Sequence, residues 1–255
     1  MTTSALPALD EIDWSRPWLA PWRACGERLA GRAADCGLVE ALNAIVDVDM
    51  RSRAGPLRFV AQSGLPPGEP YEAFIARTGC VPTRANLHDF FNGLAWLVHP
   101  GLKRRLNELQ AQQIADAAPG APRGAVRDAL TLFDENAALL QAPEALLEAL
   151  RRRDWHTLFV TGKALWAEAE LHLFGHALLE KLVRPRKAIT AHVWVLPQAP
   201  GGRRRAWDDV ADTLDVRVLA ARPFLPLPVL GVPGWWPENQ DRAFYRDPTV
   251  FRASR

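Results

Sequence analysis

Cysteine and long apolar runs are scarce in this sequence. The 255 residues contain three cysteines, an odd number without zinc-type spacing, which argues against a disulfide scaffold and favours free thiols in a reducing compartment. No segment reaches the roughly 18 consecutive apolar residues that span a membrane. Residues 1–13 lack the basic start and apolar stretch of a secretory signal. We therefore expect a cytoplasmic protein with no membrane partner.

Lysine is also rare, because 27 of the 31 basic residues are arginine. The basic runs at 103–105, 151–153 and 203–205 are short, separated and flanked by acids or helix-like sequence. Such runs are typical of solvated helix faces, and the net charge of +2 is small. A nucleic-acid partner is therefore not expected, since it would require the arginines to gather on one face.

Several well-known functional motifs are absent as well. The sequence has no glycine-rich phosphate loop, no G-x-S-x-G elbow and no H-E-x-x-H pair, which argues against P-loop, Rossmann, nucleophile-elbow and zincin sites. What is present is an ordinary globular composition, with 48% hydrophobic and 24% charged residues. We expect an N-terminal tail at 1–13 and a single domain at 14–255.

The periodicity of the apolar residues predicts an α+β fold, a mainly helical single domain with a few short strands including a hairpin. We expect the N-terminal segment with Trp14, Trp18 and Trp22 to be extended or broken and to lie against the core. The proline-rich C-terminal segment from 223 onward is also expected to be extended. We predict helices at 38–46, 69–78, 86–98, 102–114, 143–152, 163–183 and 207–218, strands at 57–61 and 189–196, a loop at 118–124, and a hairpin over 129–140. The helices at 86–98 and 102–114 are expected to be antiparallel neighbours.

The first polar cluster lies at the start of the helix predicted after Asn86. His88 and Asn92 are four residues apart and share a helix face, and Asp89 lies in the first turn. An imidazole beside a carboxylate suits general acid/base catalysis or metal binding. Alternatively, Asp89 caps the helix and His88 donates a hydrogen bond to a nearby carbonyl.

A second cluster is acidic and surrounds the predicted hairpin turn. Asp128, Asp134 and Glu135 lie within eight residues, and Asn136 follows them. Carboxylates at this spacing can raise one another's pKa or bind a hard cation such as Mg²⁺. Turns also collect Asp, Glu and Asn for purely structural reasons.

The third cluster is a stripe of Glu168, His172, His176 and Glu180 at four-residue intervals on the long predicted helix. Two histidines at this spacing can share one Zn²⁺ or Fe²⁺ ion, but the same stripe is typical of a solvated helix face. His176 differs, because apolar residues surround it on both sides, which indicates burial. His192, on the predicted strand at 189–196, is interpreted as a structural residue.

Three stretches together resemble a bacterial family, catalogued as domain of unknown function 3025. They are Val81-Pro82-Thr83-Arg84 through Asn86-Leu87-His88-Asp89-Phe90-Phe91-Asn92-Gly93, then Arg127-Asp128 through Asp134-Glu135-Asn136, and Leu173-Phe174-Gly175-His176 through Glu180-Lys181. The C-terminal stretches 230–235 and 244–245 fit it too, so the resemblance covers roughly residues 14 to 252. It implies no activity, but it draws attention to the polar residues inside these motifs, and His172 lies just outside the third.

The leading hypothesis is an enzyme, a hydrolase or group transferase that acts on a small polar ligand. The predicted catalytic residues are His88, Asp89, Asp134, Glu135 and His176, and the predicted substrate-binding residues are Asn92, Asn136, Asp128 and Lys181. A divalent metal is the candidate cofactor, with His88, Asp89 and His176 as its ligands. The alternative is a non-catalytic binding or scaffold protein whose polar motifs form a buried network.

Overall fold

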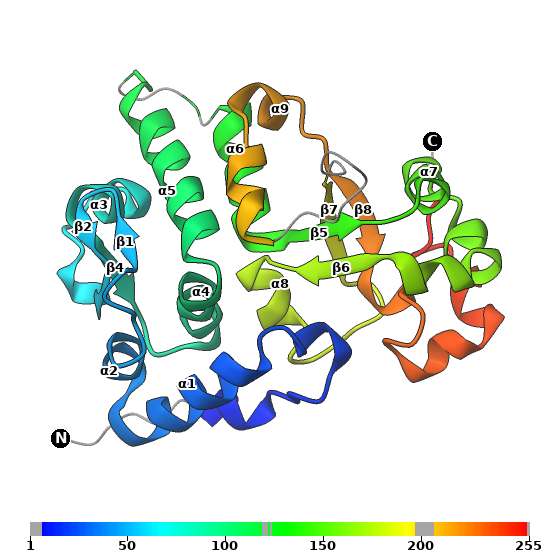
Figure 1. Cartoon of the computed structure of the whole chain (residues 1–255), viewed down its shortest axis with the longest axis horizontal. Coiled ribbons are helices and arrows are strands. Elements are labelled where there is room, and N and C mark those ends of the chain that lie inside the picture. The colour runs from blue at the N-terminus through cyan, green and yellow to red at the C-terminus, as the bar shows by residue number, and fades with distance from the viewer. Residues whose placement is uncertain (1–6, 119–121, 123, 197–206, 254–255) are drawn as a thin grey trace.

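The computed structural model describes residues 7–118, 122, 124–196 and 207–253 (Figure 1). Its helices are α1 (Arg23–Cys36), α2 (Leu38–Asn43), α3 (Tyr71–Thr78), α4 (Leu87–Val98), α5 (Pro100–Ala115), α6 (Ala125–Asn136), α7 (Glu144–Arg152), α8 (His176–Lys181) and α9 (Val216–Ala220). Its strands are β1 (Arg51–Ser52), β2 (Gly55–Pro56), β3 (Arg58–Ala61), β4 (Cys80–Thr83), β5 (Ala137–Gln141), β6 (Glu170–Leu173), β7 (Thr190–Val195) and β8 (Leu225–Pro228). The fold is α+β and mainly helical, as predicted.

The largest sheet has the strand order β6-β5-β7-β8 and is buried on both faces at its centre. The strands β5 and β7 are parallel, and the outer strands β6 and β8 each run antiparallel to their neighbour. Alternate side chains of β5 enter different cores: Leu139 packs with α5, α6 and α9, whereas Leu140 packs with α4, α7 and α8. Figure 1 shows α6 and α9 on one side of this sheet and α8 with the N-terminal segment on the other.

A second lobe contains α2, α3 and two small sheets. The strands β3 and β4 pair in parallel, and β1 and β2 form a short antiparallel hairpin. The helix α5 packs against both α3 and α6, so it joins this lobe to the main sheet (Figure 1). The candidate site lies where these elements meet.

Local sequence signals located several elements correctly. The strand predicted at 57–61 is β3, and the helix predicted at 69–78 is α3, which ends at Gly79 with φ 74°. Asn86 caps α4, because its side-chain oxygen accepts a hydrogen bond from the Asp89 amide at 2.7 Å. The helices predicted at 38–46 and 143–152 and the strand predicted at 189–196 correspond to α2, α7 and β7.

The predicted hairpin over 129–140 is wrong. Residues Ala125–Asn136 form the continuous helix α6, which passes directly into β5 at Ala137. The polar residues 134–136 therefore occupy the last helical turn instead of a β-turn. Apolar side chains on one helix face, Ala129, Leu130 and Phe133, are buried, so packing against the sheet decides this segment. The hairpin of this fold is instead the short β1–β2 pair.

The long helix predicted at 163–183 is also wrong, because the segment divides into a 3-10 turn at Lys163–Glu168, the strand β6 and the short helix α8. Pairing of β6 with β5 overrides the local helical spacing. The predicted four-residue stripe therefore does not exist. His172 lies on the strand, whereas His176 begins α8 and shares a helix face with Glu180.

Three further expectations need correction. The helices α4 and α5 are neighbours, as predicted, but Figure 1 shows α4 nearly end-on and α5 lengthwise, so they cross instead of running antiparallel. The helix predicted at 207–218 is divided into a 3-10 helix at Trp207–Thr213 and α9. The C-terminal segment is not simply extended, since it contains β8 and several 3-10 turns. Most of the loop predicted at 118–124 lies outside the described residues.

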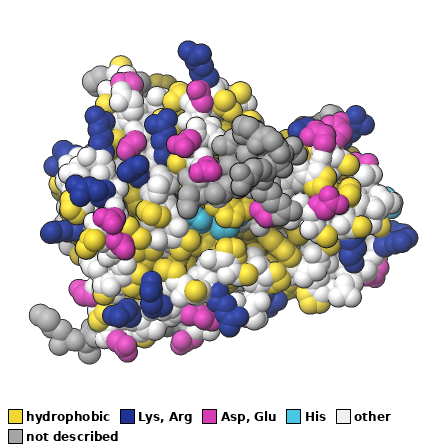
Figure 2. Space-filling model, viewed as in Figure 1, with side chains coloured by type: hydrophobic (Ala, Val, Ile, Leu, Met, Phe, Trp, Pro, Cys, Tyr) yellow, Lys and Arg dark blue, Asp and Glu magenta, His cyan; other side chains and the backbone are white. Residues whose placement is uncertain are grey.

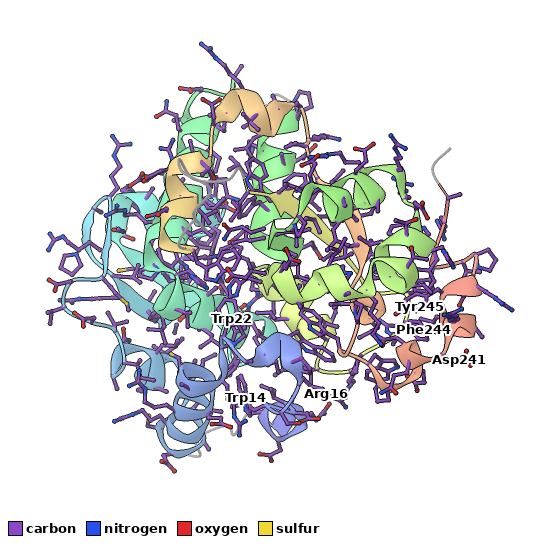
Figure 3. All side chains as sticks on the ribbon, turned by 45° about the vertical axis from the view of Figure 1, so that its right-hand side comes forward. Trp14, Arg16, Trp22, Asp241, Phe244 and Tyr245 are labelled. Carbon is purple, nitrogen blue, oxygen red and sulfur yellow. The ribbon has the colours of Figure 1, made fainter. Side chains whose placement is uncertain are left out.

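The two ends of the described chain complete the packing. Leu9 and Ile12, from the segment predicted to be a tail, are buried in the core, as are Trp18 and Trp22. Figure 3 shows Trp14 and Trp22 on the N-terminal segment and Phe244 and Tyr245 on a C-terminal 3-10 turn. No helix in the part of the chain that the structure describes has the length and apolarity needed to cross a membrane.

Candidate active site

A cavity of about 300 Å³ lies between α3, α4, α5, α6 and α8. Both clusters around His88 and Asp134 reach it, although they are far apart in the sequence. Figure 2 shows one face of the protein, on which charged side chains of both signs are spread without forming a patch and hydrophobic side chains gather near the middle. The residues that line the cavity include Tyr71, Glu72, Arg84, His88, Asp89, Asn92, Gln110, Asp134, Glu135 and His176.

The first turn of α4 forms one wall of the cavity. The cap at Asn86 directs the Asp89 carboxylate back toward Arg84, whose Nη2 and Nε atoms donate hydrogen bonds of 2.9 and 3.1 Å to it. The Arg84 backbone amide donates a third hydrogen bond at 2.5 Å. Asp89 is therefore a buried, fully engaged carboxylate that holds the loop before α4 in place. His88, one residue earlier, lines the cavity.

The opposite wall is formed by the junction between β6 and α8. Gly175 passes so close to the end of α6 that a Cβ atom would lie 2.4 Å from the Glu135 carbonyl oxygen. This approach brings the His176 Nδ1 atom to 2.8 Å from the Asp134 carbonyl oxygen. Carbonyl groups in the last turn of a helix lack intrahelical partners, so the histidine satisfies one of them.

The rings of His88 and His176 meet in this cavity. Their Nε2 atoms are 3.1 Å apart, and His88 Nδ1 lies 2.9 Å from Glu180 Oε2. Because the Asp134 carbonyl can only accept, His176 Nδ1 carries a proton. A neutral His176 then accepts at Nε2, so His88 donates from Nε2. The Glu180 carboxylate accepts a hydrogen bond from His88 Nδ1 when that nitrogen carries a proton, so a His88 ring with protons on both nitrogens satisfies both contacts.

A buried ion pair between Lys103 and Asp134 lies next to the two histidines. The Lys103 Nζ atom lies 2.5 Å from Asp134 Oδ1 and 2.8 Å from Asn92 Oδ1. Asn92 Nδ2 in turn donates to the Tyr71 hydroxyl at 2.9 Å, and the Lys103 ammonium lies 5.6 Å from the centre of the Trp96 ring. A continuous chain of polar contacts therefore runs from Tyr71 through Lys103 and Asp134 to the histidine pair.

Burial and charge set the protonation states in this chain. Burial lowers the pKa of His176 to about 4, and the opposing charge of Asp134 does not restore it. Burial alone would raise the pKa of Asp134, but the charges of Lys103 and His176 hold it below its usual range. Burial, together with the charge of Asp89, raises the pKa of the Tyr71 hydroxyl. Near neutral pH the site thus holds a neutral His176, an ionised Asp134 and a protonated Tyr71.

The donor set does not fit the predicted metal centre. His88 and His176 present their Nε2 atoms to each other, but the carboxylate of Asp89, the third predicted ligand, is bound by Arg84. Among the residues that the structure describes, no group of three or more His, Cys, Asp or Glu side chains is placed to hold a metal ion. A metal at this site is therefore not part of the function proposed below.

Not all of the predicted site residues come together. Glu135 lines the cavity with the residues already named, but three predicted substrate-binding residues lie elsewhere. Asp128 pairs with Arg222 on an exposed surface at 2.9 Å. Lys181 Nζ donates to Asn136 Oδ1 at 2.8 Å, and Lys181 lines an open groove of about 960 Å³ on the outer side of Glu180.

The structure adds residues that sequence reasoning missed. Lys103 was expected on a solvated face, but it is buried, which corrects that expectation. Its signal is the spacing of Lys103, Asn107 and Gln110, three buried polar side chains on one helix face. Tyr71 and Arg84 offered no comparable pattern.

Comparison with known proteins gives a family and no further relatives. The model of the family described as Protein of unknown function (DUF3025) matches residues 57–255, and the chain belongs to this family. The matched region contains every residue of the cavity discussed above. No curated protein and no solved structure matches the chain significantly.

Proposed function

We propose that this protein is an enzyme that uses His88 and Glu180 for general acid/base catalysis on a small polar substrate, in a hydrolysis or group-transfer reaction. The observation that carries the proposal is the His88–Glu180 pair, in which His88 lines the 300 Å³ cavity beside the buried His176 and Glu180 lines the open groove next to it. Catalytic proton transfer requires a group whose proton can move near neutral pH and that can reach the substrate.

Some of the surrounding residues transfer protons in this proposal, and others hold the transferring groups in position. His176 fixes the orientation of the His88 ring through the Nε2 contact, while the Asp134 carbonyl fixes the tautomer of His176. The proton shared by His88 and Glu180 can be given to a leaving group, and the neutral His88 can then accept one from water or from a second substrate. Tyr71 accepts from Asn92, so its own hydroxyl proton is available to a bound molecule.

The scaffold alternative explains the buried part of the network but not the open part. Lys103, Asn92 and Asp134 fit a buried hydrogen-bond network that fixes helix packing. However, the side chains of His88 and Glu180 are 34% and 37% exposed, and a hydrogen bond open to solvent adds little to stability. A partly exposed histidine in contact with a carboxylate beside a cavity favours catalysis over packing.

The experiment is a turnover test in which the substrate does not have to be identified first. The purified protein is incubated with a small-molecule extract of bacterial cells, and mass spectrometry follows the compounds that are consumed and formed. We expect wild-type protein to convert at least one compound, and His88→Ala to reduce that conversion at least 100-fold. Glu180→Gln should reduce it about tenfold or more, because the carboxylate no longer shares the proton.

A matched control separates catalysis from folding. His156→Ala removes an exposed histidine outside the cavity, so it should leave the conversion unchanged. Circular dichroism and urea denaturation verify that each variant is folded. If every conversion made by wild-type protein persists in a folded His88→Ala variant, or if none occurs, the proposed enzymatic function is wrong.

A further inference from the structure

The charges around the cavity do not balance. Arg84 pairs with Asp89, and Lys103 and His88 pair with Asp134 and Glu180 respectively. Two carboxylates on the cavity wall, Glu72 on α3 and Glu135 on α6, have no ion pair among the described residues. The cavity therefore has an excess of negative charge, carried by Glu72 and Glu135.

A buried amide in the same wall also lacks a partner. Gln110 on α5 is only 7% exposed and lines the cavity, and its side chain makes no hydrogen bond within the described part of the chain. Its amide is not among the sealed polar atoms of that part, so it is open to the cavity. A buried amide has two donors and an acceptor that must be satisfied by protein, water or ligand. Because Glu72 and Gln110 also line the small adjoining hollow beside Lys103 and Asp134, the unsatisfied amide and the unpaired carboxylate belong to one region.

We propose that Glu72, Glu135 and Gln110 form a subsite for an organic cation, so that the substrate of this enzyme carries an ammonium or guanidinium group. This inference rests on the proposed function and names its substrate class. An organic cation donates several hydrogen bonds, and two carboxylates with an amide oxygen supply matching acceptors. The cation would occupy the wall formed by α3, α5 and α6, which leaves the reacting part of the substrate beside His88 on α4.

An organic cation explains the subsite better than a metal ion. Hard divalent cations require several oxygen ligands that converge on one point, and the described residues contain no such group of three His, Cys, Asp or Glu side chains. An ammonium or guanidinium group makes separate hydrogen bonds in different directions, so its acceptors need not converge. A cavity of about 300 Å³ is at the small end of ligand pockets, which suits a small metabolite.

The test compares three probes of equal length and different charge. Butylammonium, butan-1-ol and butyrate are titrated into the full-length protein, and binding is followed by shifts of backbone amide resonances around the cavity. We expect butylammonium to bind at least tenfold more tightly than butan-1-ol, and butyrate to bind more weakly than either. Glu72→Gln and Glu135→Gln should each weaken butylammonium binding about tenfold, while leaving butan-1-ol binding unchanged.

Two further variants make the test specific. Glu40→Gln removes an exposed carboxylate of α2 far from the cavity wall and should not alter butylammonium binding. Gln110→Leu keeps the side-chain volume but removes the amide, so it should weaken butylammonium binding without loss of stability. Equal or tighter binding of butyrate, unchanged affinity in both glutamate variants, or competition of Mg²⁺ or Zn²⁺ for the same resonances would overturn the cation subsite.

The outcomes separate this inference from the proposed function. If the compounds whose conversion depends on His88 carry no cationic group, the cation subsite is wrong while the enzymatic function stands. If butylammonium binds as expected but no conversion depends on His88, the cavity binds cations without catalysis, and the proposed function fails instead.

Discussion

The protein contains two histidine pairs that are alike in geometry and different in surroundings. In the first, His88 and His176 have ring centres 4.6 Å apart and Nε2 atoms 3.1 Å apart. In the second, His99 and His172 have ring centres 4.8 Å apart and Nε2 atoms 2.8 Å apart. His88 lies in the first turn of α4, and His99 is the residue at its C-terminal cap, so the two pairs lie at opposite ends of the same helix.

The difference is in what surrounds each ring. The first pair ends in the Glu180 carboxylate and the Asp134 carbonyl and lines the candidate cavity. In the second, the His172 ring stacks on the indoles of Trp22 and Trp207, and its Nδ1 atom has no hydrogen-bond partner among the described residues. Two imidazoles in contact therefore do not define a site. His172 also lines a hollow, of about 430 Å³, so access to a cavity does not separate the pairs either. A carboxylate in contact with the ring distinguishes the first pair, and stacking between two indoles distinguishes the second.

The largest expected effect concerns the ion pair beneath the first histidine pair. Lys103→Met leaves the Asp134 carboxylate in the interior without a cation, and losing one partner of a buried pair costs about 3–5 kcal/mol. We expect the free energy of unfolding, measured with urea at pH 7.5, to fall by that amount. This result would show that the first pair depends on the buried Lys103–Asp134 ion pair.

The same substitution elsewhere is its control. Lys187 pairs with Asp247 at 3.2 Å on the partly exposed surface, so Lys187→Met should cost less than about 1 kcal/mol. Adding Asp134→Asn to Lys103→Met should recover part of the lost stability, because the unpaired charge is then removed. Equal losses for the two lysine variants would mean that Asp134 is hydrated in spite of its position.

Replacing one histidine from each pair tests the comparison directly. His172 is 2% exposed and stacked between aromatic rings, so His172→Ala leaves a void and should destabilise the protein by about 2–4 kcal/mol. His88→Ala removes a partly exposed ring from the edge of a cavity and should cost less than about 1 kcal/mol. Urea denaturation of both variants at pH 7.5 measures the difference. A loss with His88→Ala as large as with His172→Ala would make both pairs structural.

Sequence reasoning succeeded where neighbouring residues decide the structure. Asn86 caps α4 and Gly79 ends α3 because short-range hydrogen bonds and backbone freedom suffice there. It failed at 129–140 and 170–173, where pairing within the sheet and packing against it decide the outcome. Helical spacing cannot reveal a strand that forms only because β5 lies beside it.

The residues of the candidate site were likewise predicted only in part. His88 was predicted because it lies beside a carboxylate at the start of a helix, and His176 because apolar residues surround it. The structure brings them together. Lys103 was overlooked because a run of basic residues is ordinarily solvated, and its partners Asp134 and Asn92 come from other helices. Glu180 was correctly predicted to share a helix face with His176, but that helix is the short α8 and not the predicted long helix.

The most gradual expected effect is a dependence of the free energy of unfolding on pH. Burial lowers the pKa of His176 to about 4 and of His172 to about 3, whereas both titrate near 6.5 in an unfolded chain. Between pH 6.5 and 4 the unfolded chain therefore binds more protons than the folded chain. Their contribution to stability is fully present above pH 6.5 and is lost on acidification, at up to about 1.4 kcal/mol per pH unit for each histidine.

Urea denaturation at pH 7.5, 6.5, 5.5 and 4.5 measures this slope, and His172→Phe tests its origin. Phenylalanine keeps the aromatic contacts with Trp22 and Trp207 but cannot be protonated, so we expect the slope between pH 6.5 and 4.5 to fall. The remaining slope would come from His176 and from His192, whose pKa values burial also lowers. An unchanged slope would mean that His172 takes up its proton in the folded protein, which requires water to reach the second pair and would remove the contrast between the two.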